Sequence, residues 1–510
     1  MSERRPLLLG ASIGLLAGGV AIGMAHLVAG LIDPLSSPVI AVGRAAIDLT
    51  PEWLKGWAIR TFGERDKTVL LIGIGVVLVL LAVALGVASE RRAWIGFASL
   101  FALAAIGLAA ALSRPDASAL SVVPTIAGIG AGAVALVYLR RSSSPAGREP
   151  FAEMPAGLDR RRFLIASGVA AVGALAAGGL GNVLGRRLRA DASRAGVTIP
   201  VPADRASPAG ADLDDVRGVE PFFTPNDRFY RVDTALLVPA VTAEEWRLRV
   251  HGMVERELTL DYDQLLSRPL IERDVTLACV SNEVGGRYVG NARWIGVPLR
   301  ELLDETGVDP RADQLVSRSA DGFTAGTPTT VVTDGRDAML AVGMNGEPLP
   351  VAHGFPVRMI VPGLYGYVSA TKWLVDLELT TFDAFDAYWI RRGWAERAPI
   401  KTMSRIDTPA ASSTVRAGEV PVAGVAWAQH RGIARVEVRV DDGAWLEAEL
   451  APAGTIDTWR QWLVRWNATP GDHRLQVRAT DGDGLTQPEA RTTPFPDGAT
   501  GWHGVTVHVT

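Results

Sequence analysis

The single cysteine of this 510-residue chain, Cys279, is the first candidate for chemistry. An apolar, β-prone run (Val275–Leu277) precedes it, and a segment rich in Ser, Asn and Gly follows it. This pattern predicts a strand that ends at a loop, where a side chain can meet a ligand. A lone thiol cannot form an internal disulfide. Cys279 is therefore a buried small hydrophobe, a metal ligand or a nucleophile.

Three other segments carry side chains suited to binding a phosphate and a polar heterocycle. Residues 223–231 form a polar and aromatic run. Residues 353–367 predict a strand that carries Arg358 and leaves through a Gly-rich turn. Ser369, Thr371 and Lys372 follow that turn. Each segment alone also fits a structural role, because an Arg on a strand is commonly a satisfied ion pair.

Taken in order with Cys279, these segments resemble the sulfite oxidase family of molybdopterin enzymes. The resemblance covers roughly residues 219–510 and rests on six motifs: TPNDRFYR (224–231), TLACVSN (276–282), WIGVPL (294–299), MNGEPLP (344–350), HGFPVR (353–358) and KWL (372–374). Residues 397–400 and 404–407 then join a C-terminal segment that looks like the family's dimerisation domain.

The resemblance implies a molybdenum–molybdopterin cofactor whose metal is bound by the Cys279 thiolate, a soft ligand that suits this metal. It places Asn282 beside Cys279 in the catalytic group. The implied pterin contacts are Asn226, Tyr230 and Arg231. The implied contacts to the cofactor's polar end and phosphate are His353 and Arg358, with further contacts from Ser369, Thr371 and Lys372. Ser317 or Ser319 could add one more.

Two departures from the sulfite-oxidising members bear on the substrate. Glu283 stands where those members have an Arg after the cysteine, and Ala341–Gly343 lacks their Tyr. A carboxylate near the metal would repel the sulfite dianion, although Arg287, Arg293 and Lys401 could restore positive charge. The sequence therefore predicts a substrate other than sulfite, such as an oxidised sulfur or nitrogen compound reduced by oxygen-atom transfer.

Three alternatives stay open at this point. The chain could be a sulfite oxidase or dehydrogenase proper. It could be a non-catalytic, membrane-tethered binding module of the same fold, which the retained Cys279, His353, Arg358 and Lys372 argue against. Cys279 could also act as a covalent nucleophile with His353 as its base, without a metal. That last reading leaves Arg358 and Lys372 unexplained.

The first 190 residues concentrate the apolar composition that gives the chain its mean hydropathy of +0.19. Five uncharged runs are long enough to span about 30 Å of hydrocarbon. These runs are Pro6–Ile32, Val69–Ser89, Ala93–Ser113, Ala117–Leu139 and Phe163–Gly185. They predict a four-span region over residues 1–145 and a fifth span within 146–190.

Arginines flank alternate ends of these runs, and their positions predict how the spans are oriented in the membrane. They are Arg4, Arg5, Arg91, Arg92, Arg140, Arg141, Arg148 and Arg160–Arg162. Those ends should face the cytoplasm, which puts the catalytic part on the extracytoplasmic side of the cell membrane. The segment Asp159–Leu164 resembles a twin-arginine export signal inside the chain; it also fits an ordinary positive flank.

The sequence also bounds the cofactors and partners. One cysteine excludes a Cys-x-x-Cys-His haem attachment, and His26 is the only histidine of the first four runs, so we expect no haem, flavin or iron–sulfur cluster in this chain. Electrons would then pass to an external cytochrome or quinone-linked carrier. A net charge of −4 gives no case for nucleic acid. The expected partners are a small-molecule substrate, the lipid bilayer and, through the C-terminal domain, a second copy in a homodimer.

Beyond a linker predicted over Asp191–Gly218, the soluble part divides in two. Residues 219–395 predict an α+β domain, with strands at Trp246–Val250 and Val357–Val361 and a helix over Leu299–Thr306 stopped by Gly307. Residues 396–510 alternate apolar and polar residues in short runs and predict an antiparallel, immunoglobulin-like sandwich. These runs are Arg435–Val440, Trp459–Trp466, His473–Ala479 and Gly504–Val509.

Overall fold

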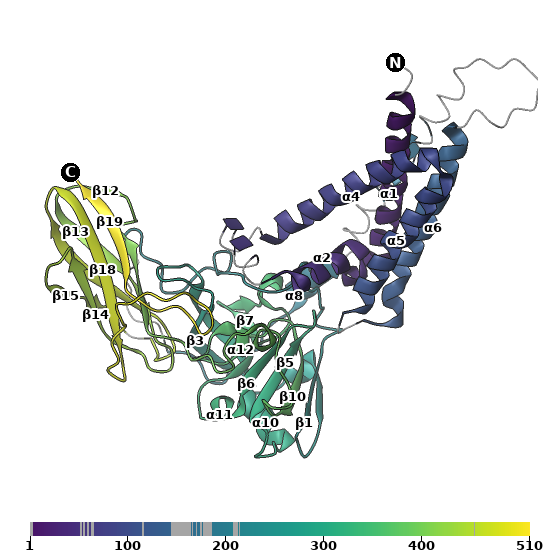
Figure 1. The fold of residues 1–510 in the computed structure, drawn as a ribbon. Helices are drawn as coiled ribbons and strands as arrows, with labels where there is room; N and C mark the ends of the chain where they lie inside the picture. The colour runs from purple at the N-terminus through teal and green to yellow at the C-terminus, as the bar shows by residue number, and fades with distance from the viewer. Residues whose placement is uncertain are drawn as a thin grey trace, which may run out of the picture. The chain divides into compact units, whose positions relative to one another are not determined.

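A computed structural model describes residues 4–510 except parts of 52–65, residues 115–116, most of 144–185, parts of 208–214 and residue 453. The chain forms two compact units (Figure 1). The helical unit contains residues 1–189 and 235–240, and the second unit contains residues 190–234 and 241–510.

Four helices of the helical unit are long and apolar enough to cross a membrane, in agreement with the first four predicted runs. The helices of this unit are α1 (Arg4–Ile32), α2 (Pro38–Leu49), α4 (Asp66–Arg91), α5 (Ala93–Leu112) and α6 (Val123–Ser143), with 3-10 turns η1 (Pro34–Ser36) and η3 (Ala119–Val122). Most of the predicted fifth span, Phe163–Gly185, and all of the Asp159–Leu164 motif fall outside the described residues.

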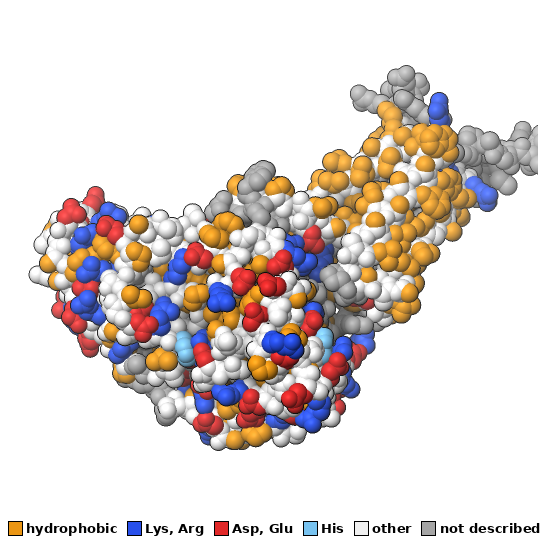
Figure 2. Space-filling model, turned by 60° about the horizontal axis from the view of Figure 1, so that its bottom comes forward, with side chains coloured by type: hydrophobic (Ala, Val, Ile, Leu, Met, Phe, Trp, Pro, Cys, Tyr) orange, Lys and Arg blue, Asp and Glu red, His pale blue; other side chains and the backbone are white. Residues whose placement is uncertain are grey.

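Glycines allow these helices to approach each other closely. A Cβ on Gly14 of α1 would lie 2.1 Å from the Ala82 carbonyl oxygen of α4, and one on Gly128 of α6 would lie 2.6 Å from the Ala21 oxygen of α1. Small residues at such crossings are typical of helices that pack in lipid. Figure 2 shows hydrophobic side chains covering the visible face of this unit.

Two sheets build the first part of the second unit. One has the order β2-β1-β10-β5-β6, and the other has the order β3-β4-β7-β8, with β9 paired to β7. Their bounds are β1 (Arg247–Gly252), β2 (Leu258–Asp261), β3 (Ile271–Ala278), β4 (Val289–Pro298), β5 (Gln314–Ser319), β6 (Thr324–Pro328), β7 (Met339–Met344), β8 (Glu347–Pro348), β9 (Arg358–Ile360) and β10 (Leu374–Thr380). The predicted strands at 246–250, 275–277 and 357–361 are confirmed.

Short helices connect these strands: α9 (Tyr262–Leu266), α10 (Leu299–Thr306), α11 (Thr329–Val332), α12 (Gly366–Ser369) and the 3-10 turns η4 (Val351–His353) and η5 (Ile390–Arg392). The helix predicted over Leu299–Thr306 is confirmed. It ends where predicted, because Gly307 adopts the left-handed conformation with φ of 65°.

The C-terminal part is β-rich, with two sheets that share one apolar core. One sheet contains β11 (Met403–Thr408), β13 (Gly418–Trp427), β17 (Arg460–Ala468) and β16 (Glu449–Leu450). The other contains β12 (Thr414–Val415), β19 (His503–Val509), β18 (Gly471–Asp481), β14 (Ile433–Val440) and β15 (Trp445–Glu447). The four alternating runs noted in the sequence all form strands, while their immunoglobulin-like type stays a prediction.

The segment expected to be a linker, Asp191–Gly218, is partly ordered, which corrects that expectation. Its first residues complete helix α8 (Arg186–Gly196). Asp204 then pairs with Ile271 beside β3. Ile199 lies within 2.6 Å of the position a Cβ on Gly343 would take. Backbone pairing and apolar contact hold the segment in place, and neither leaves a periodic signal in so short a stretch.

The sandwich is tied to β3 through Thr276. Its backbone N–H donates to the Asp457 oxygen at 2.9 Å, and its carbonyl accepts from the Gln429 side chain at 2.8 Å. Its hydroxyl accepts from the Trp459 N–H at 2.7 Å. Because of such contacts the predicted domains 219–395 and 396–510 pack as one compact unit.

Candidate functional site

Strand β3 ends at Ala278 and delivers Cys279 to a closed loop. The Cys279 N–H donates to the Tyr288 oxygen at 2.9 Å, and the Asn282 N–H donates to the Cys279 oxygen at 3.0 Å. The Asn282 side-chain oxygen accepts from the Tyr288 N–H at 2.9 Å. These bonds fix the half-buried thiol at the end of the strand, which is the arrangement that the sequence predicted.

The thiol lines a cavity of about 110 Å³ that opens at the surface of the unit. Five of the ten predicted site residues line this cavity: Tyr230, Cys279, His353, Arg358 and Lys372. Segments separated by more than 140 residues thus meet at one place, as the motif order implied.

Arg358, at the start of β9, is buried with only part of its guanidinium satisfied. Nη1 donates to the His353 oxygen at 3.1 Å and Nη2 to the Ala370 oxygen at 3.4 Å. Its Nε is buried and has no hydrogen-bond partner among the described residues. Burial lowers the pKa of Arg358 to about 10. A buried cation with an unused N–H is a ready anion contact.

Lys372 is the second cation of the cavity. Its Nζ donates to Asp233 at 2.8 Å, and Arg231 donates to the same carboxylate at 2.8 Å. Burial lowers the pKa of Lys372 to about 8, with Asp233 opposing the shift and Arg358 adding to it. Arg231 therefore acts through Asp233 on the lysine and does not itself line the cavity.

The thiol of Cys279 is held mainly in its neutral form when nothing is bound. Burial raises the pKa of Cys279, while hydrogen bonds from the Ser281 backbone and hydroxyl and the charge of Lys372 oppose the rise. Binding of a cation at the sulfur would favour the thiolate.

His353 is neutral at physiological pH and oriented by the backbone. Its Nε2 lies 3.0 Å from the Asn226 carbonyl oxygen, and because a carbonyl only accepts, Nε2 carries the proton. Burial, followed by the charges of Arg358 and Lys372, lowers the pKa of His353 to about 3.

This histidine should make the protein acid-sensitive. Between pH 6.5 and 3 the folded state binds fewer protons at His353 than the unfolded state, so stability is lost as the pH falls through that window. At pH 4.5 the loss from this group is about 3 kcal/mol. Urea unfolding at pH 7.5 and pH 4.5 should show a smaller difference in His353→Gln than in the wild type. Equal differences in both proteins would refute the assignment.

The other five predicted residues, Asn226, Arg231, Asn282, Ser369 and Thr371, are not among the residues that line the cavity. Asn226 donates to Glu347 at 2.6 Å and accepts from Asn345 at 2.9 Å. Ser369 donates to the Leu364 oxygen, and Thr371 bonds to the Ser317 hydroxyl at 2.7 Å. Of the two serines left open, Ser319 lines the cavity and Ser317 supports Thr371.

Glu283 corrects the charge argument drawn from the sequence. The residue is exposed and does not line the cavity, so the structure gives no support to repulsion of a dianion by its carboxylate. The loop turns it away because the Asn282 side chain bonds back to Tyr288. Sequence distance from Cys279 could not reveal this turn.

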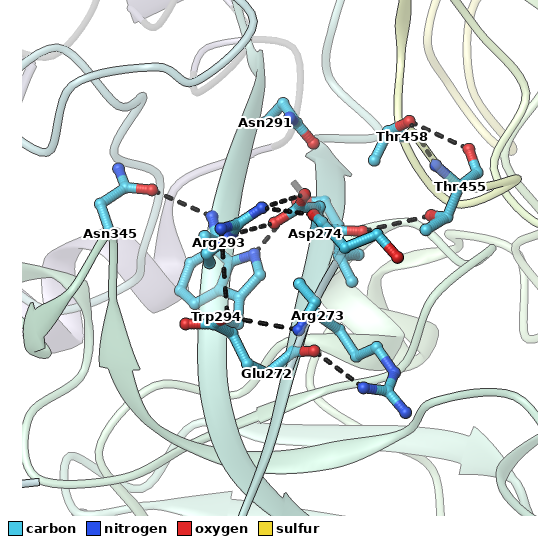
Figure 3. A network of polar contacts seen from close by, with 12 residues as sticks. Glu272, Arg273, Asp274, Asn291, Arg293, Trp294, Asn345, Thr455 and Thr458 are labelled. Carbon is cyan, nitrogen blue, oxygen red and sulfur yellow. Dashed lines mark hydrogen bonds and ion pairs between the residues drawn. The ribbon is translucent and has the colours of Figure 1, made fainter. Parts of the chain in front are cut away.

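The three basic residues considered as compensating charges also lie outside the cavity lining. Arg293 forms a bidentate pair with Asp274, at 2.7 and 2.9 Å, and its backbone N–H donates to the Asn345 side-chain oxygen at 2.9 Å (Figure 3). Lys401 pairs with Asp497 at 2.9 Å, and Arg287 is exposed. Arg293 thus stabilises the β3–β4 pair.

Sequence reasoning missed the acidic and aromatic part of the lining. These residues are Asp233, Asp321, Phe323, Trp389 and Trp394, together with Tyr367, which ends the segment 353–367 but was given no role. Tyr367 and Trp394 lie 6.0 Å apart between ring centroids, and Trp389 and Trp394 lie 6.1 Å apart. Tyr367 lies in the short helix α12, and the other five residues come from segments between helices and strands. The available signal was the position of Asp233, which lies two residues after Arg231, the end of the motif at 224–231.

Gly285 lets the cysteine loop rest on the sandwich. Its φ is +79°, and a Cβ there would lie 2.3 Å from the imidazole of His503. Arg405 donates to the next carbonyl, that of Gly286, at 3.0 Å.

Gly285→Ala is therefore expected to cost more stability than backbone strain alone, which is about 1–3 kcal/mol. Gly335→Ala is the matched control, because Gly335 has φ of +102° and nothing within 4 Å of an added Cβ. Denaturant unfolding of both variants measures the difference. Equal costs would show that contact with His503 does not position the loop.

The residues present fit a molybdopterin. Among the described residues, no group of three or more His, Cys, Asp or Glu side chains is placed to hold a metal ion. A metal at Cys279 would thus take most of its ligands from a cofactor. The orphaned Nε of Arg358 and the ammonium of Lys372 supply cationic donors for an anionic cofactor tail.

Comparison with known proteins adds to this picture. A family model described as an oxidoreductase molybdopterin binding domain matches residues 235–389. The mitochondrial sulfite oxidase of Rattus norvegicus is 30% identical over 319 residues, which cover 53% of this chain and 58% of that protein. The uncharacterized oxidoreductase YuiH of Bacillus subtilis (strain 168) is 30% identical over 153 residues, which cover 30% of this chain and 74% of that protein.

The fold is also shared with a solved structure. The sulfane dehydrogenase SoxCD from Paracoccus pantotrophus aligns with a TM-score of 0.50 and 24% identity, over 57% of this chain and 85% of that chain. The chain spans little more than half the length of the sulfite oxidase it matches, 58%.

Proposed function

Because the chain belongs to the sulfite oxidase family of molybdenum-dependent oxidoreductases, we propose that it transfers an oxygen atom to or from a small substrate at Cys279. The observation that carries this proposal is the meeting of the Cys279 thiol, the unsatisfied Arg358 and Lys372 in one cavity. When bound, the molybdenum cofactor would supply the two-electron chemistry.

The chain's own residues would then hold and orient the cofactor. Cys279 provides the metal ligand, and Arg358 and Lys372 neutralise its anionic part. Neutral His353 lines the cavity, and its backbone carbonyl accepts a hydrogen bond from Arg358. Five residues that were expected to touch the cofactor do not line the cavity, and their side chains bond to other residues of the unit. They are therefore better suited to fixing the lining residues in place: Asn226, Arg231, Asn282, Ser369 and Thr371.

We propose a substrate other than the sulfite dianion, on grounds different from Glu283. The charged side chains that line the cavity, among the described residues, are the cations Arg358 and Lys372 and the carboxylates Asp233 and Asp321. A bound cofactor phosphate would use both cations, so a dianion would find no free positive partner. Phe323, Tyr367, Trp389 and Trp394 would instead accept a neutral substrate with an apolar group.

Sulfite oxidation is the second candidate, favoured by the 30% identity to a sulfite oxidase. The two candidates differ in a steady-state assay of the molybdenum-loaded protein with artificial electron carriers. We expect kcat/KM for a neutral sulfoxide or amine oxide to exceed that for sulfite at least about tenfold, the effect of a 1.4 kcal/mol difference. Fast sulfite oxidation would refute the substrate proposal and leave the cofactor assignment intact.

We further propose that the helical unit anchors the chain in the cell membrane with the catalytic unit on the extracytoplasmic side. Four helices of sufficient length and Arg140 and Arg141 in the last turn of α6 support this topology. Electrons would pass to an external carrier, and the sandwich could join two copies. Protease protection in oriented vesicles tests the orientation.

A further inference from the structure

The helical unit contains a cavity of about 490 Å³, which falls in the range of small-molecule sites. Helices α1, α2, α4, α5 and α6 all line it. The lining side chains are aliphatic or absent, apart from a few hydroxyls. This composition suits an apolar ligand.

The cavity follows from how the helices cross. Gly14 and Gly86 bring α1 and α4 together, since a Cβ on Gly86 would lie 2.8 Å from the Cα of Gly14. Figure 1 shows α4 then running at an angle away from α5 and α6. Beyond the crossing, Gly75 on α4 has nothing within 4 Å of an added Cβ and lines the cavity. The diverging helices thus leave a space that neither fills.

One hydroxyl in this space has no partner. Thr125 of α6 is only 4% exposed and lines the cavity, and its Oγ1 has no hydrogen bond among the described residues. Two other lining hydroxyls are satisfied, because Ser89 donates to the Gly86 oxygen at 2.7 Å and Ser99 to the Gly96 oxygen at 3.0 Å. A buried, unpaired hydroxyl is costly, so a ligand carbonyl that accepts from Thr125 would relieve that cost.

The lack of charged side chains among the described lining residues limits the chemical class of ligand that fits the cavity. No Lys, Arg, Asp or Glu occurs among the described residues that line the cavity, so a phospholipid phosphate would have no counter-charge there. The fitting ligand is neutral, largely apolar and carries a carbonyl. We propose that this cavity binds an isoprenoid quinone, with a ring carbonyl accepting from Thr125 and the tail against the aliphatic lining.

This inference rests on the helices lying in a bilayer and is independent of the chemistry at Cys279. A quinone accepts or donates two electrons, the number exchanged when an oxygen atom is transferred. The helical unit would then be a binding site for a redox molecule as well as an anchor.

The test uses the full chain in phosphatidylcholine nanodiscs and photolabelling by an azido-benzoquinone with a decyl tail. Gly75→Leu fills the cavity, and Gly73→Leu is its matched control, because Gly73 also lies on α4 with nothing within 4 Å but does not line the cavity. Leucine favours a helix over glycine, so both variants should fold. We expect labelling of cavity peptides to fall at least about tenfold in Gly75→Leu, because the added side chain takes the place of the apolar tail, and to persist in Gly73→Leu.

A second pair of variants tests the hydrogen bond. Decyl-ubiquinone should compete about fivefold less well for Thr125→Val, the scale of one neutral hydrogen bond, and normally for Thr125→Ser. Equal labelling of the two glycine variants, no competition by decyl-ubiquinone, or unchanged competition in Thr125→Val would overturn the proposal. Co-purified phosphatidylcholine that the quinone does not displace would identify a lipid occupant instead. None of these readouts requires molybdenum.

Discussion

Cys279→Ser is expected to abolish turnover and most bound molybdenum while much of the pterin stays in place. A serine hydroxyl is a harder and far less acidic ligand than a thiol. The residues proposed to hold the pterin and its phosphate, Arg358 and Lys372, are unchanged in this variant. Activity should fall at least about 100-fold, since loss of even an outer partner of a metal ligand costs up to that much.

Metal content by elemental analysis and pterin content by fluorescence after release separate the two effects. Ser281→Ala is the matched control, because its hydroxyl bonds to the thiol without replacing it, and it should retain molybdenum. A Cys279→Ser protein with unchanged molybdenum and activity would exclude the thiolate as a ligand. It would also favour the readings in which the cysteine only packs.

Arg358→Met should lose pterin and molybdenum together, in contrast to Cys279→Ser. The substitution keeps a similar length but removes the buried cation whose Nε is unpaired. A charge-assisted hydrogen bond contributes about 1.5–3 kcal/mol, so cofactor content at limiting supply should fall at least about tenfold. The cofactor-free variant should be no less stable than the wild type, because burial lowers the pKa of Arg358 to about 10 and thus disfavours its charge.

Arg318→Met is the control for Arg358→Met. Arg318 pairs with Asp376 at 2.6 Å and with Glu378, and it lies outside the lining of the cavity. Its loss should lower the unfolding free energy in urea and spare the cofactor. If both variants keep the cofactor equally well, Arg358 does not bind its anionic part.

Local patterns predicted the elements that carry the site. A β-prone run before a lone cysteine is enough to predict β3 and its loop, and long uncharged runs are enough to predict α1, α4, α5 and α6. The ordered motifs also placed Tyr230, His353, Arg358 and Lys372 in one site with Cys279. All five residues line one cavity, and their contact with a cofactor stays a prediction.

Such patterns could not predict the direction in which a loop side chain points. Glu283 lies four residues from Cys279, yet it is exposed, because the loop is shaped by Asn282 bonding to Tyr288 and by His503 against Gly285. Trp389 and Trp394 reach the cavity from an aperiodic loop. Tertiary contacts set these positions, and they leave no trace in spacing.

The bonds of Thr276 have a mechanical consequence. Its N–H, carbonyl and hydroxyl are all held by sandwich residues, three positions before Cys279. These three hydrogen bonds join the sandwich directly to the strand that presents the thiol. A partner that binds the sandwich would therefore transmit force directly to the cysteine loop. A second copy of the chain would be one such partner.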